Sequence, residues 1–493
     1  MKSKDLLIAQ VVGSITRQES HSSPLTTHAS PRLCALPPLA LYIHIPWCVK
    51  KCPYCDFNSH EIPQQPLTTM ELRDASALKS PRPRSRPGAS HAESRGHFNS
   101  HEIPRQPIAT TELRYASSLK SPRPRSRPDA SHAESRGHFN SHETHSKIPE
   151  QQYVEALIAD LESALPQVWG RRIHSVFFGG GTPSIFQAES IDAILTSVRA
   201  LLPVDSYAEI TLEANPGTFE VEKFAAFRSA GINRLSIGIQ SFNPRHLKAL
   251  GRIHDEKEAR RAIEIAQTHF DNINLDLMYA LPGQSVEEAR QDIETAISFF
   301  PKHISAYHLT IEPNTLFHRN PPQLPDDESS AEMQEVIEQT LAAHGYEHYE
   351  TSAFARKGFQ SRHNMNYWLF GDYLGIGAGA HSKISMQQKI IRQMCYKQPK
   401  EYMNQAAGGT PVQERHEIAS RDLGFEFMMN ALRLIHGFPA ALFEERTGLP
   451  ITQLQKQLDA AEQRGLIDRY HQRIAPTPRG QRFLNDLLQL FLP

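Results

Sequence analysis

Short apolar runs alternate with amphipathic stretches along most of the chain. Runs rich in Ile, Val, Leu and Phe cover residues 39–44, 174–178, 208–213, 234–240, 272–279 and 303–311. Between these runs, apolar residues recur with helical spacing over residues 151–165, 188–202, 221–230, 255–268 and 285–299. Strands that alternate with helices predict a parallel α/β sheet, here a partial (βα)6 barrel, with ligands at the carboxyl ends of its strands.

A long insertion interrupts this pattern. The first strand ends near residue 44 and its helix begins near residue 151, whereas such a connection normally takes only a few residues. Residues 58–98 and 99–139 are two copies of one unit, and a third copy starts at residue 140 and breaks off. Pro, Arg, Ser and His dominate the unit, so we expect residues 58–139 to be disordered and dispensable. The alternative is a binding arm for nucleic acid or a protein, which the modest charge and scarcity of aromatic residues disfavour.

The C-terminal residues show a different pattern. Helices are predicted over residues 420–434, 439–445, 451–464 and 479–490, with a β-like stretch over residues 466–474, as in a winged-helix domain. In the candidate recognition helix, Lys456 and Arg464 are offset by Asp459 and Glu462. DNA-binding helices usually carry several uncompensated basic residues, so we expect this domain to have a packing role.

These patterns divide the chain into five segments. They are a disordered N-terminal extension (1–35), the first strand and its loop (36–57), the insert (58–139), the rest of the barrel (140–385) and the winged-helix-like domain (410–493).

Composition narrows the location and the partners of the protein. The 493 residues carry a formal net charge of −1, so no global charge draws the chain to nucleic acid or to an anionic membrane. The five cysteines are too few and too unevenly placed for a disulfide framework. The N-terminus is a poor signal peptide, and no apolar run approaches the ~20 residues of a membrane span. We therefore expect a cytoplasmic protein.

Three cysteines follow the first strand directly. Cys48, Cys52 and Cys55 have the spacing C-x3-C-x2-C. Three thiolates can hold three irons of a [4Fe–4S] cluster and leave the fourth iron for the amino and carboxylate groups of a small molecule. A zinc site would need a fourth ligand, for which His44 and His60 are candidates, and ordinary core cysteines are the third interpretation. The spacing on a strand-to-helix loop favours the cluster.

Polar residues and glycines lie at the ends of the other strands. A Gly-Gly-Gly-Thr-Pro run (179–183) ends the second strand and would let backbone amides approach a ligand. Glu213, Gln240, Arg252 and Asp276 lie at or just past the ends of later strands. Such side chains are costly on apolar strands unless they form hydrogen bonds, so they either bind a ligand or satisfy one another across the barrel mouth.

Together these motifs resemble the HemW-type heme chaperones, radical SAM proteins related to the oxygen-independent coproporphyrinogen III dehydrogenases. The resemblance covers residues 32–57 and 140–493. It rests on the cysteine motif, the Gly-Gly-Gly-Thr-Pro run, Leu-Glu-Ala-Asn-Pro-Gly (212–217), Leu-Ser-Ile-Gly-Ile-Gln-Ser-Phe (235–242), Leu-Pro-Gly-Gln (281–284) and His-Asn-Met-Asn-Tyr-Trp (363–368).

The resemblance implies roles for individual residues. Cys48, Cys52 and Cys55 match the cluster ligands. The positions that match S-adenosylmethionine contacts in the dehydrogenases are Tyr42, Gly180, Gly181, Thr182, Glu213, Gln240, Arg252 and Asp276. In the chaperones, the segment that begins at His363 is the proposed heme motif, with His363 as iron ligand and Tyr367 and Trp368 packed on the macrocycle. A buried His363 that holds the barrel against the C-terminal domain is the alternative, and His381 is a second candidate ligand.

The residue at position 57 distinguishes the chaperone family from the dehydrogenase family. The dehydrogenases resemble C-x3-C-x2-C-x-C, whereas this chain has Phe57 in place of the fourth cysteine. The resemblance thus favours a heme chaperone that carries a [4Fe–4S] cluster, S-adenosylmethionine and heme, and passes heme to an acceptor protein, which could be membrane-bound. An electron donor is implied, a homodimer is left open and nucleic acid is not expected. The alternatives are a coproporphyrinogen III dehydrogenase and, from the Arg/Pro repeat and winged helix, a nucleic-acid-binding regulator.

Overall fold

The computed structural model describes residues 32–62, 148–217 and 221–493. The expectations for residues 1–31 and for nearly all of the insert lie outside the described residues.

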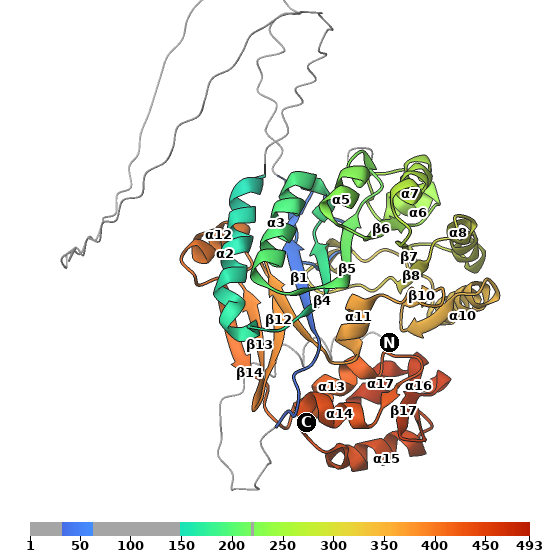
Figure 1. Ribbon diagram of the computed structural model, residues 1–493. Helices are drawn as coiled ribbons and strands as arrows, with labels where there is room; N and C mark the ends of the chain where they lie inside the picture. The colour runs from blue at the N-terminus through green and yellow to red at the C-terminus, as the bar shows by residue number, and fades with distance from the viewer. Residues whose placement is uncertain (1–31, 63–147, 218–220) are drawn as a thin grey trace, which may run out of the picture. The chain divides into compact units, whose positions relative to one another are not determined.

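The predicted barrel strands lie side by side in chain order and run parallel. These strands are β1 (Leu39–Ile45), β4 (Ile173–Gly180), β5 (Val204–Ala214), β6 (Arg234–Gln240), β7 (Ile273–Tyr279) and β8 (His303–His308). The helices that follow them cover the outer face (Figure 1) and are α2 (Glu150–Val168), α3 (Ala188–Leu201), α5 (Phe224–Ala230), α7 (Glu256–His269) and α8 (Val286–Ser298). The predicted partial (βα)6 barrel is confirmed.

Local sequence fixes where the barrel helices begin. Asp255 and Ser285 each accept a hydrogen bond from the backbone of a glutamate three positions later, and that glutamate returns a bond to the cap. This capping box satisfies amide groups that the first helical turn leaves unpaired. Shorter helical pieces at the barrel rim are η1 (Pro183–Ile185), α6 (Pro244–Ala249) and α9 (Leu316–Arg319).

The same sheet continues beyond the barrel strands on both sides, to twelve strands among the described residues. On the β8 side it adds β10 (Ala353–Ala355) and β9 (Glu347–Glu350), which α10 (Asp327–Ala343) precedes. On the β1 side it adds the parallel strand β11 (Asp372–Ile376) and the antiparallel strands β12 (His381–Met386), β13 (Lys389–Cys395) and β14 (Val412–Glu417), with α12 (Pro399–Ala407) between the last two. The helix α11 (Arg362–Trp368) lies between the two extensions in sequence. The hydrophobic pattern predicted none of these elements.

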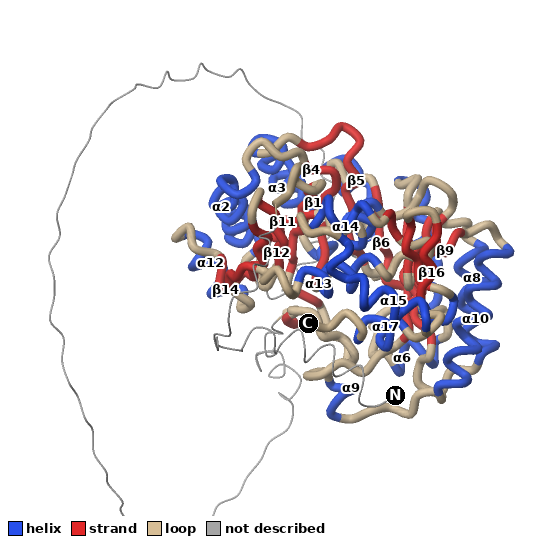
Figure 2. Tube along the Cα trace, turned by 90° about the horizontal axis from the view of Figure 1, so that it is seen from below, coloured by secondary structure: helices blue, strands red, loops and turns tan. Residues whose placement is uncertain are grey.

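The C-terminal residues form a compact helical group around a three-stranded sheet. Its elements are α13 (Leu423–Ala431), β15 (Phe438–Pro439), α14 (Ala441–Thr447), η2 (Ile451–Leu454), α15 (Gln455–Gln463), β16 (Ile467–Tyr470), β17 (Arg473–Pro476), α16 (Pro478–Arg482) and α17 (Leu484–Gln489). Phe427, Phe438 and Phe443 are fully buried in its core. In Figure 2 the barrel is viewed from the end where α13, α14 and α15 lie.

Two predicted C-terminal helices are each divided. Residues 451–464 form a 3-10 turn followed by α15, and residues 479–490 break at Phe483 into α16 and α17. In α15, Asp459 and Glu462 bind Arg469 of β16. None of the helices in the described ranges combines the length and apolar character that a bilayer crossing requires.

Candidate functional site

The three motif cysteines lie on one loop at the carboxyl end of β1. Cys48 is buried on β2 (Trp47–Cys48), which pairs with β3 (His60–Glu61), and Cys52 and Cys55 are partly exposed. All three thiols are free and line one cavity of about 430 Å³. Burial raises the pKa of Cys48 to about 11 and also raises that of Cys55. A metal that binds these sulfurs as thiolates must therefore displace their protons.

The donor set fits an iron–sulfur cluster better than a zinc ion. In the described part of the chain, no three His, Cys, Asp or Glu side chains meet at a point suited to a single metal ion. A [4Fe–4S] cluster binds each thiolate through a different iron, so it does not require such convergence. Both ring nitrogens of His44 are already bonded, Nε2 to the Asn58 carbonyl at 2.9 Å and Nδ1 to the Tyr42 hydroxyl at 3.0 Å. His44 is therefore not free to act as a fourth zinc ligand.

The cysteine loop is tied to the barrel by hydrogen bonds. The Asn58 side-chain amide donates to the carbonyls of Ala378 (2.9 Å) and Lys397 (2.8 Å), just past β11 and β13. The Trp47 carbonyl accepts from the Thr182 amide at 2.7 Å. Gly181 permits this approach, because a Cβ atom there would lie 2.4 Å from the Trp47 oxygen. The loop is thus held by the segments that follow β4, β11 and β13.

The cavity collects nearly all the residues predicted to contact S-adenosylmethionine. Its wall includes Gly180, Gly181, Thr182, Glu213, Gln240, Arg252 and Asp276 together with the three cysteines. Tyr42 does not line the wall; it lies behind it, with its hydroxyl on His44. The carboxyl ends of the parallel strands meet at this edge, which is why residues far apart in sequence share one cavity.

Asn215 connects the polar groups of the wall, and sequence reasoning did not select it. Its amide donates to the Thr182 hydroxyl at 3.0 Å, and its carbonyl oxygen accepts from Arg252 at 2.6 Å. Arg252 also bonds the Gly238 carbonyl at 2.7 Å and approaches the Cys52 sulfur at 3.6 Å. Asn215 lies within the Leu-Glu-Ala-Asn-Pro-Gly motif, so the motif itself was the available signal.

Two partly buried carboxyl groups, those of Glu213 and Asp276, line this cavity. Burial, together with the nearby Asp276, raises the pKa of Glu213 to about 8. Burial also raises the pKa of Asp276, which accepts hydrogen bonds from Ser236 and Asn274, both at 2.8 Å. A cationic ligand would stabilise the charged form of both groups and so lower their pKa values. The cavity is therefore suited to a ligand with positive charge.

The segment with the predicted heme residues lies at the other end of the barrel. His363, on α11, is 2% exposed, and its ring stacks on Phe177 of β4 at 4.8 Å between ring centroids. Its Nδ1 shares a hydrogen bond with the Ser175 hydroxyl at 3.1 Å, and burial lowers its pKa to about 3. The Tyr367 ring meets His363 edge-on at 5.1 Å. None of these residues lines the cysteine cavity.

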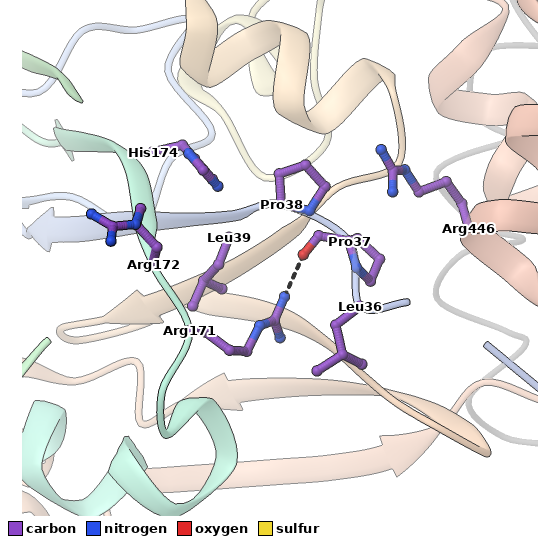
Figure 3. A pocket seen from close by; sticks show the side chains of 8 residues that line it. All are labelled: Leu36, Pro37, Pro38, Leu39, Arg171, Arg172, His174 and Arg446. Carbon is purple, nitrogen blue, oxygen red and sulfur yellow. Dashed lines mark hydrogen bonds between the residues drawn. The ribbon is translucent and has the colours of Figure 1, made fainter. Parts of the chain in front are cut away.

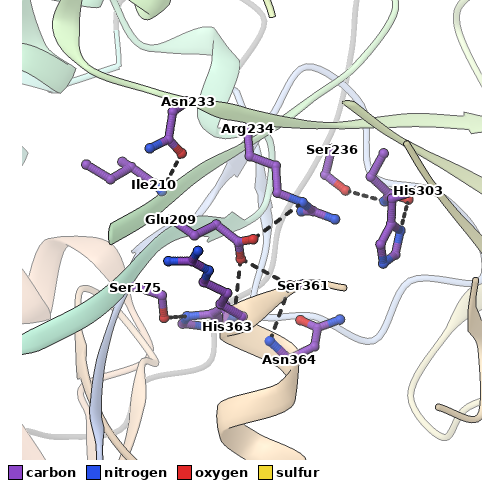
Figure 4. Close-up of polar contacts among 12 residues, drawn as sticks. Ser175, Glu209, Ile210, Asn233, Arg234, Ser236, His303, Ser361, His363 and Asn364 are labelled. Carbon is purple, nitrogen blue, oxygen red and sulfur yellow. Dashed lines mark hydrogen bonds and ion pairs between the residues drawn. The ribbon is translucent and has the colours of Figure 1, made fainter. Parts of the chain in front are cut away.

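A buried network fixes the start of α11 (Figure 4). Glu209 of β5 accepts hydrogen bonds from the Ser361 hydroxyl (3.3 Å) and the His363 amide (3.2 Å), and lies 4.0 Å from the Arg234 guanidinium. Ser361 also caps the helix by accepting from the Asn364 amide. These contacts hold α11 against β4 and β5. The other two predicted heme residues, Trp368 and His381, are not part of this network. The Trp368 ring stacks on the Arg433 guanidinium at 4.9 Å, and His381 is exposed on β12.

The fold and the cysteine loop together define a radical SAM protein. Residues 139–296 match the Radical SAM superfamily, and residues 418–483 match the HemN C-terminal domain. The solved structure of coproporphyrinogen III oxidase (HemN) from Escherichia coli, a radical SAM enzyme, has the same fold. Its TM-score is 0.64 at 19% identity, with 92% of this chain and 90% of that chain covered.

Curated relatives narrow the class further. The heme chaperone HemW of Haemophilus influenzae is 40% identical over 93% of this chain and 98% of its own length. The heme chaperone HemW of Escherichia coli is 39% identical over 93% of this chain and 99% of its own length. The chain belongs to the HemW family of heme chaperones.

Proposed function

We propose that this protein is a heme chaperone that carries a [4Fe–4S] cluster and S-adenosylmethionine, binds heme and passes it to an acceptor protein. The observation that carries the proposal is the single cavity that joins the three cysteine thiols to the predicted S-adenosylmethionine residues. The identity of 40% to a curated heme chaperone over nearly the whole chain supports heme as the cargo. The protein would work in the cytoplasm, where thiols stay reduced.

The chain's own residues would bind and orient the cofactors. Cys48, Cys52 and Cys55 would hold the cluster, which would supply an open iron site for the methionyl group and an electron for reductive cleavage of the sulfonium. Glu213 and Asp276 would face the positive charges of S-adenosylmethionine. The positive ligand would in turn stabilise the two side chains in their charged, carboxylate form. Arg252, beside Cys52, would offset the negative charge of a thiolate-bound cluster.

Heme binding is proposed for the opposite end, around α11. Tyr367 and Trp368 are partly exposed there and could contact a macrocycle, as the motif implies. The His363 ring is enclosed, so it could reach an iron only after leaving Phe177 and Ser175. An electron donor, a membrane hemoprotein as acceptor and a homodimer belong to the same proposal.

The second candidate is oxidative decarboxylation of coproporphyrinogen III. The observation in its favour is the fold shared with the HemN oxidase. At 19% identity, this likeness shows a common fold and not a common activity. Against it stands Phe57, which lines the cavity and is 61% exposed where the dehydrogenases have a cysteine.

One pair of measurements tests the choice. Anaerobically reconstituted protein is titrated with hemin, and separately incubated with coproporphyrinogen III, reductant and S-adenosylmethionine. We expect saturable hemin binding and no protoporphyrinogen. Formation of protoporphyrinogen IX, or the absence of saturable hemin binding, would overturn the chaperone proposal. The variant Cys48→Ser should fail to hold the cluster, and Cys34→Ser, at an exposed cysteine outside the loop, is its matched control.

A further inference from the structure

A series of hydrogen-bonded side chains crosses the interior of the barrel. It begins at Asp276, in the wall of the cysteine cavity, and ends at the start of α11. The side chains between these two points are buried and come from β6, β7, β8 and β9: Ser236, Asn274, His303 and Tyr349. We call these four residues the interior network. Figure 4 shows Ser236 and His303 together with the first residues of α11.

The interior network begins at the carboxyl group of Asp276. Both of its oxygens accept hydrogen bonds, one from the Ser236 hydroxyl and one from the Asn274 amide, each at 2.8 Å. The amide nitrogen of Asn274 therefore faces the carboxyl group, and the amide oxygen faces β8. There the Ser305 hydroxyl donates to that oxygen at 3.1 Å. The orientation of Asn274 is thus fixed from both sides.

His303 connects Asn274 to Tyr349. Its Nδ1 lies 2.6 Å from the Asn274 oxygen, and its Nε2 lies 2.8 Å from the Tyr349 hydroxyl. Burial lowers the pKa of His303 well below its usual range, so the ring is neutral and carries one proton. Because the Asn274 oxygen can only accept, that proton lies on Nδ1. The Nε2 atom then accepts from the Tyr349 hydroxyl.

Tyr349 makes the contact with α11. Its oxygen accepts a hydrogen bond from the backbone amide of Ser361 at 3.2 Å. Ser361 is the N-cap of α11, and its hydroxyl donates to Glu209, which also accepts from the His363 amide. Met365 of the same helix packs against the apolar cluster that includes Tyr349. The start of α11 is therefore held by Tyr349 as well as by Glu209.

All the hydrogen bonds along this path donate toward Asp276. The Ser361 amide donates to Tyr349, Tyr349 to His303, His303 to Asn274, and Asn274 to Asp276. Hydrogen bonds that point in one direction polarise one another, and an ionised carboxylate is a stronger acceptor than a neutral carboxyl group. A positive ligand in the cysteine cavity favours the ionised form of Asp276. Such a ligand therefore strengthens the interior network and its contact with α11.

This contact opposes heme binding by α11. The His363 ring can reach an iron only after it leaves Phe177 and Ser175, and its backbone amide is bonded to Glu209. That movement would draw Ser361 away from Tyr349 and break the interior network at its far end. A ligand that strengthens the network and a ligand whose binding breaks it must weaken each other's affinity.

We propose that His303 and Tyr349 are positioning residues that couple the two sites, so that a cationic ligand in the cysteine cavity weakens the binding of heme at α11. This inference rests on the proposed function and adds a control of heme release to it. Helix α11 would keep its heme while the cavity is empty and give it up when the cavity is filled. S-adenosylmethionine would then favour transfer of heme to the acceptor protein.

The test is a hemin titration of the cluster-reconstituted full chain, without reductant, in the presence and absence of S-adenosylmethionine. We expect saturating S-adenosylmethionine to raise the Kd of hemin at least about fivefold, and hemin to raise the Kd of S-adenosylmethionine by the same factor. S-adenosylhomocysteine, which lacks the sulfonium charge, should have a smaller effect. An unchanged or lower Kd of hemin, or an equal effect of the two ligands, would overturn the inference.

A pair of tyrosine variants locates the coupling. Tyr349→Phe deprives His303 and the Ser361 amide of their shared partner, so it should bind hemin equally well with and without S-adenosylmethionine. Tyr346→Phe is the matched control, because it removes an equally buried hydroxyl that bonds the Pro301 carbonyl at 2.7 Å instead. It should keep the wild-type ratio of Kd values. Wild-type coupling in Tyr349→Phe would show that Tyr349 has no part in it.

A further variant separates this inference from a loss of folding. His303→Leu interrupts the interior network on β8 and should also abolish the coupling, and circular dichroism shows whether each variant is folded. If Tyr349→Phe does not fold, His303→Leu decides alone. A wild-type chain that binds both ligands without coupling would overturn the inference and leave the proposed function standing. A wild-type chain that binds no hemin would remove the proposed function itself.

Discussion

The two ends of the barrel are built in different ways. At the carboxyl end, glycines, buried carboxyl groups and tethered cysteines enclose one cavity whose residues come from short local motifs. At the amino end, α11 packs on β4 and is hydrogen-bonded to β5, and a separate open cavity (Figure 3) is lined by Leu36–Leu39, the start of β4 and Arg446 of the C-terminal domain. The first arrangement suits a resident cofactor that stays enclosed. The second leaves its polar side chains open to solvent, with that of His174 49% exposed.

The largest expected effect is at the cysteine loop. Cys48→Ala, Cys52→Ala and Cys55→Ala should each abolish cluster incorporation, because three thiolates are the only protein ligands that the loop offers the cluster. Iron content and visible absorption after anaerobic reconstitution measure this. Cys34→Ser should reconstitute as the wild type does; if a loop variant kept its full iron content, the assignment of that cysteine would be wrong.

The next effect concerns the tether of that loop. Asn58→Ala removes two hydrogen bonds to backbone carbonyls and should lower the free energy of unfolding by about 1–3 kcal/mol. We also expect the cluster to be lost faster to an iron chelator. Asn404→Ala, at an exposed position on α12, is the control. Equal chelation rates for the two variants would show that Asn58 does not retain the cluster.

The stability of the fold should depend on pH through a buried carboxyl group, that of Asp160 on α2. Asp160 accepts hydrogen bonds from Tyr402 (2.7 Å) and the Gly377 amide (3.1 Å), and burial raises its pKa to about 6. A folded-state pKa above the unfolded value of 3.8 means that the folded protein holds the proton more tightly. Stability from this group is present below about pH 4 and is lost as the pH rises to about 6.

The variant Asp160→Asn isolates this contribution. Chemical denaturation at several pH values should show that the wild type loses about 3 kcal/mol more than the variant between pH 4 and pH 7. Parallel pH profiles for the two proteins would rule out Asp160 as the source.

The smallest effect is expected from the repeated insert. Deletion of residues 58–139 joins Phe57 to Asn140 and leaves Asn140-Ser-His-Glu where Asn58-Ser-His-Glu was. The tether residues are thus restored, and the shorter connection should change stability by no more than about 1.5 kcal/mol. Iron content and hemin affinity should match the full chain. Loss of the cluster would show that the insert has a role in holding it.

The sequence predicted the carboxyl end well and the amino end poorly. Helices and strands of the barrel have strong periodicity, and residues such as Glu213 and Asp276 stand out as polar side chains at the ends of apolar strands. Their meeting in one cavity follows from parallel topology alone. Asn215 was missed because an asparagine before proline reads as a turn residue, and its two hydrogen-bond partners are far away in sequence.

The amino end depends on contacts that periodicity does not encode. The strands β9, β10 and β11 have only 4, 3 and 5 residues, and β11 pairs with β1, more than 300 positions earlier in the chain. His363 was expected either as an iron ligand or as a buried support, and only the packing on Phe177 and Ser175 shows that it is buried. The exposed position of His174 was not predicted, because nothing in the local sequence indicates the irregular pairing of β4 beside it.

Strand β4 sets a fixed spacing between the two ends. It carries His174 near its start and Gly180 at its end. At about 3.3 Å per residue, these positions are about 20 Å apart. A cluster held at the carboxyl end and a molecule bound at the amino end would therefore share no protein ligand. Any coupling between the two ends would have to pass through the protein itself, by way of elements such as strand β4, which both ends share.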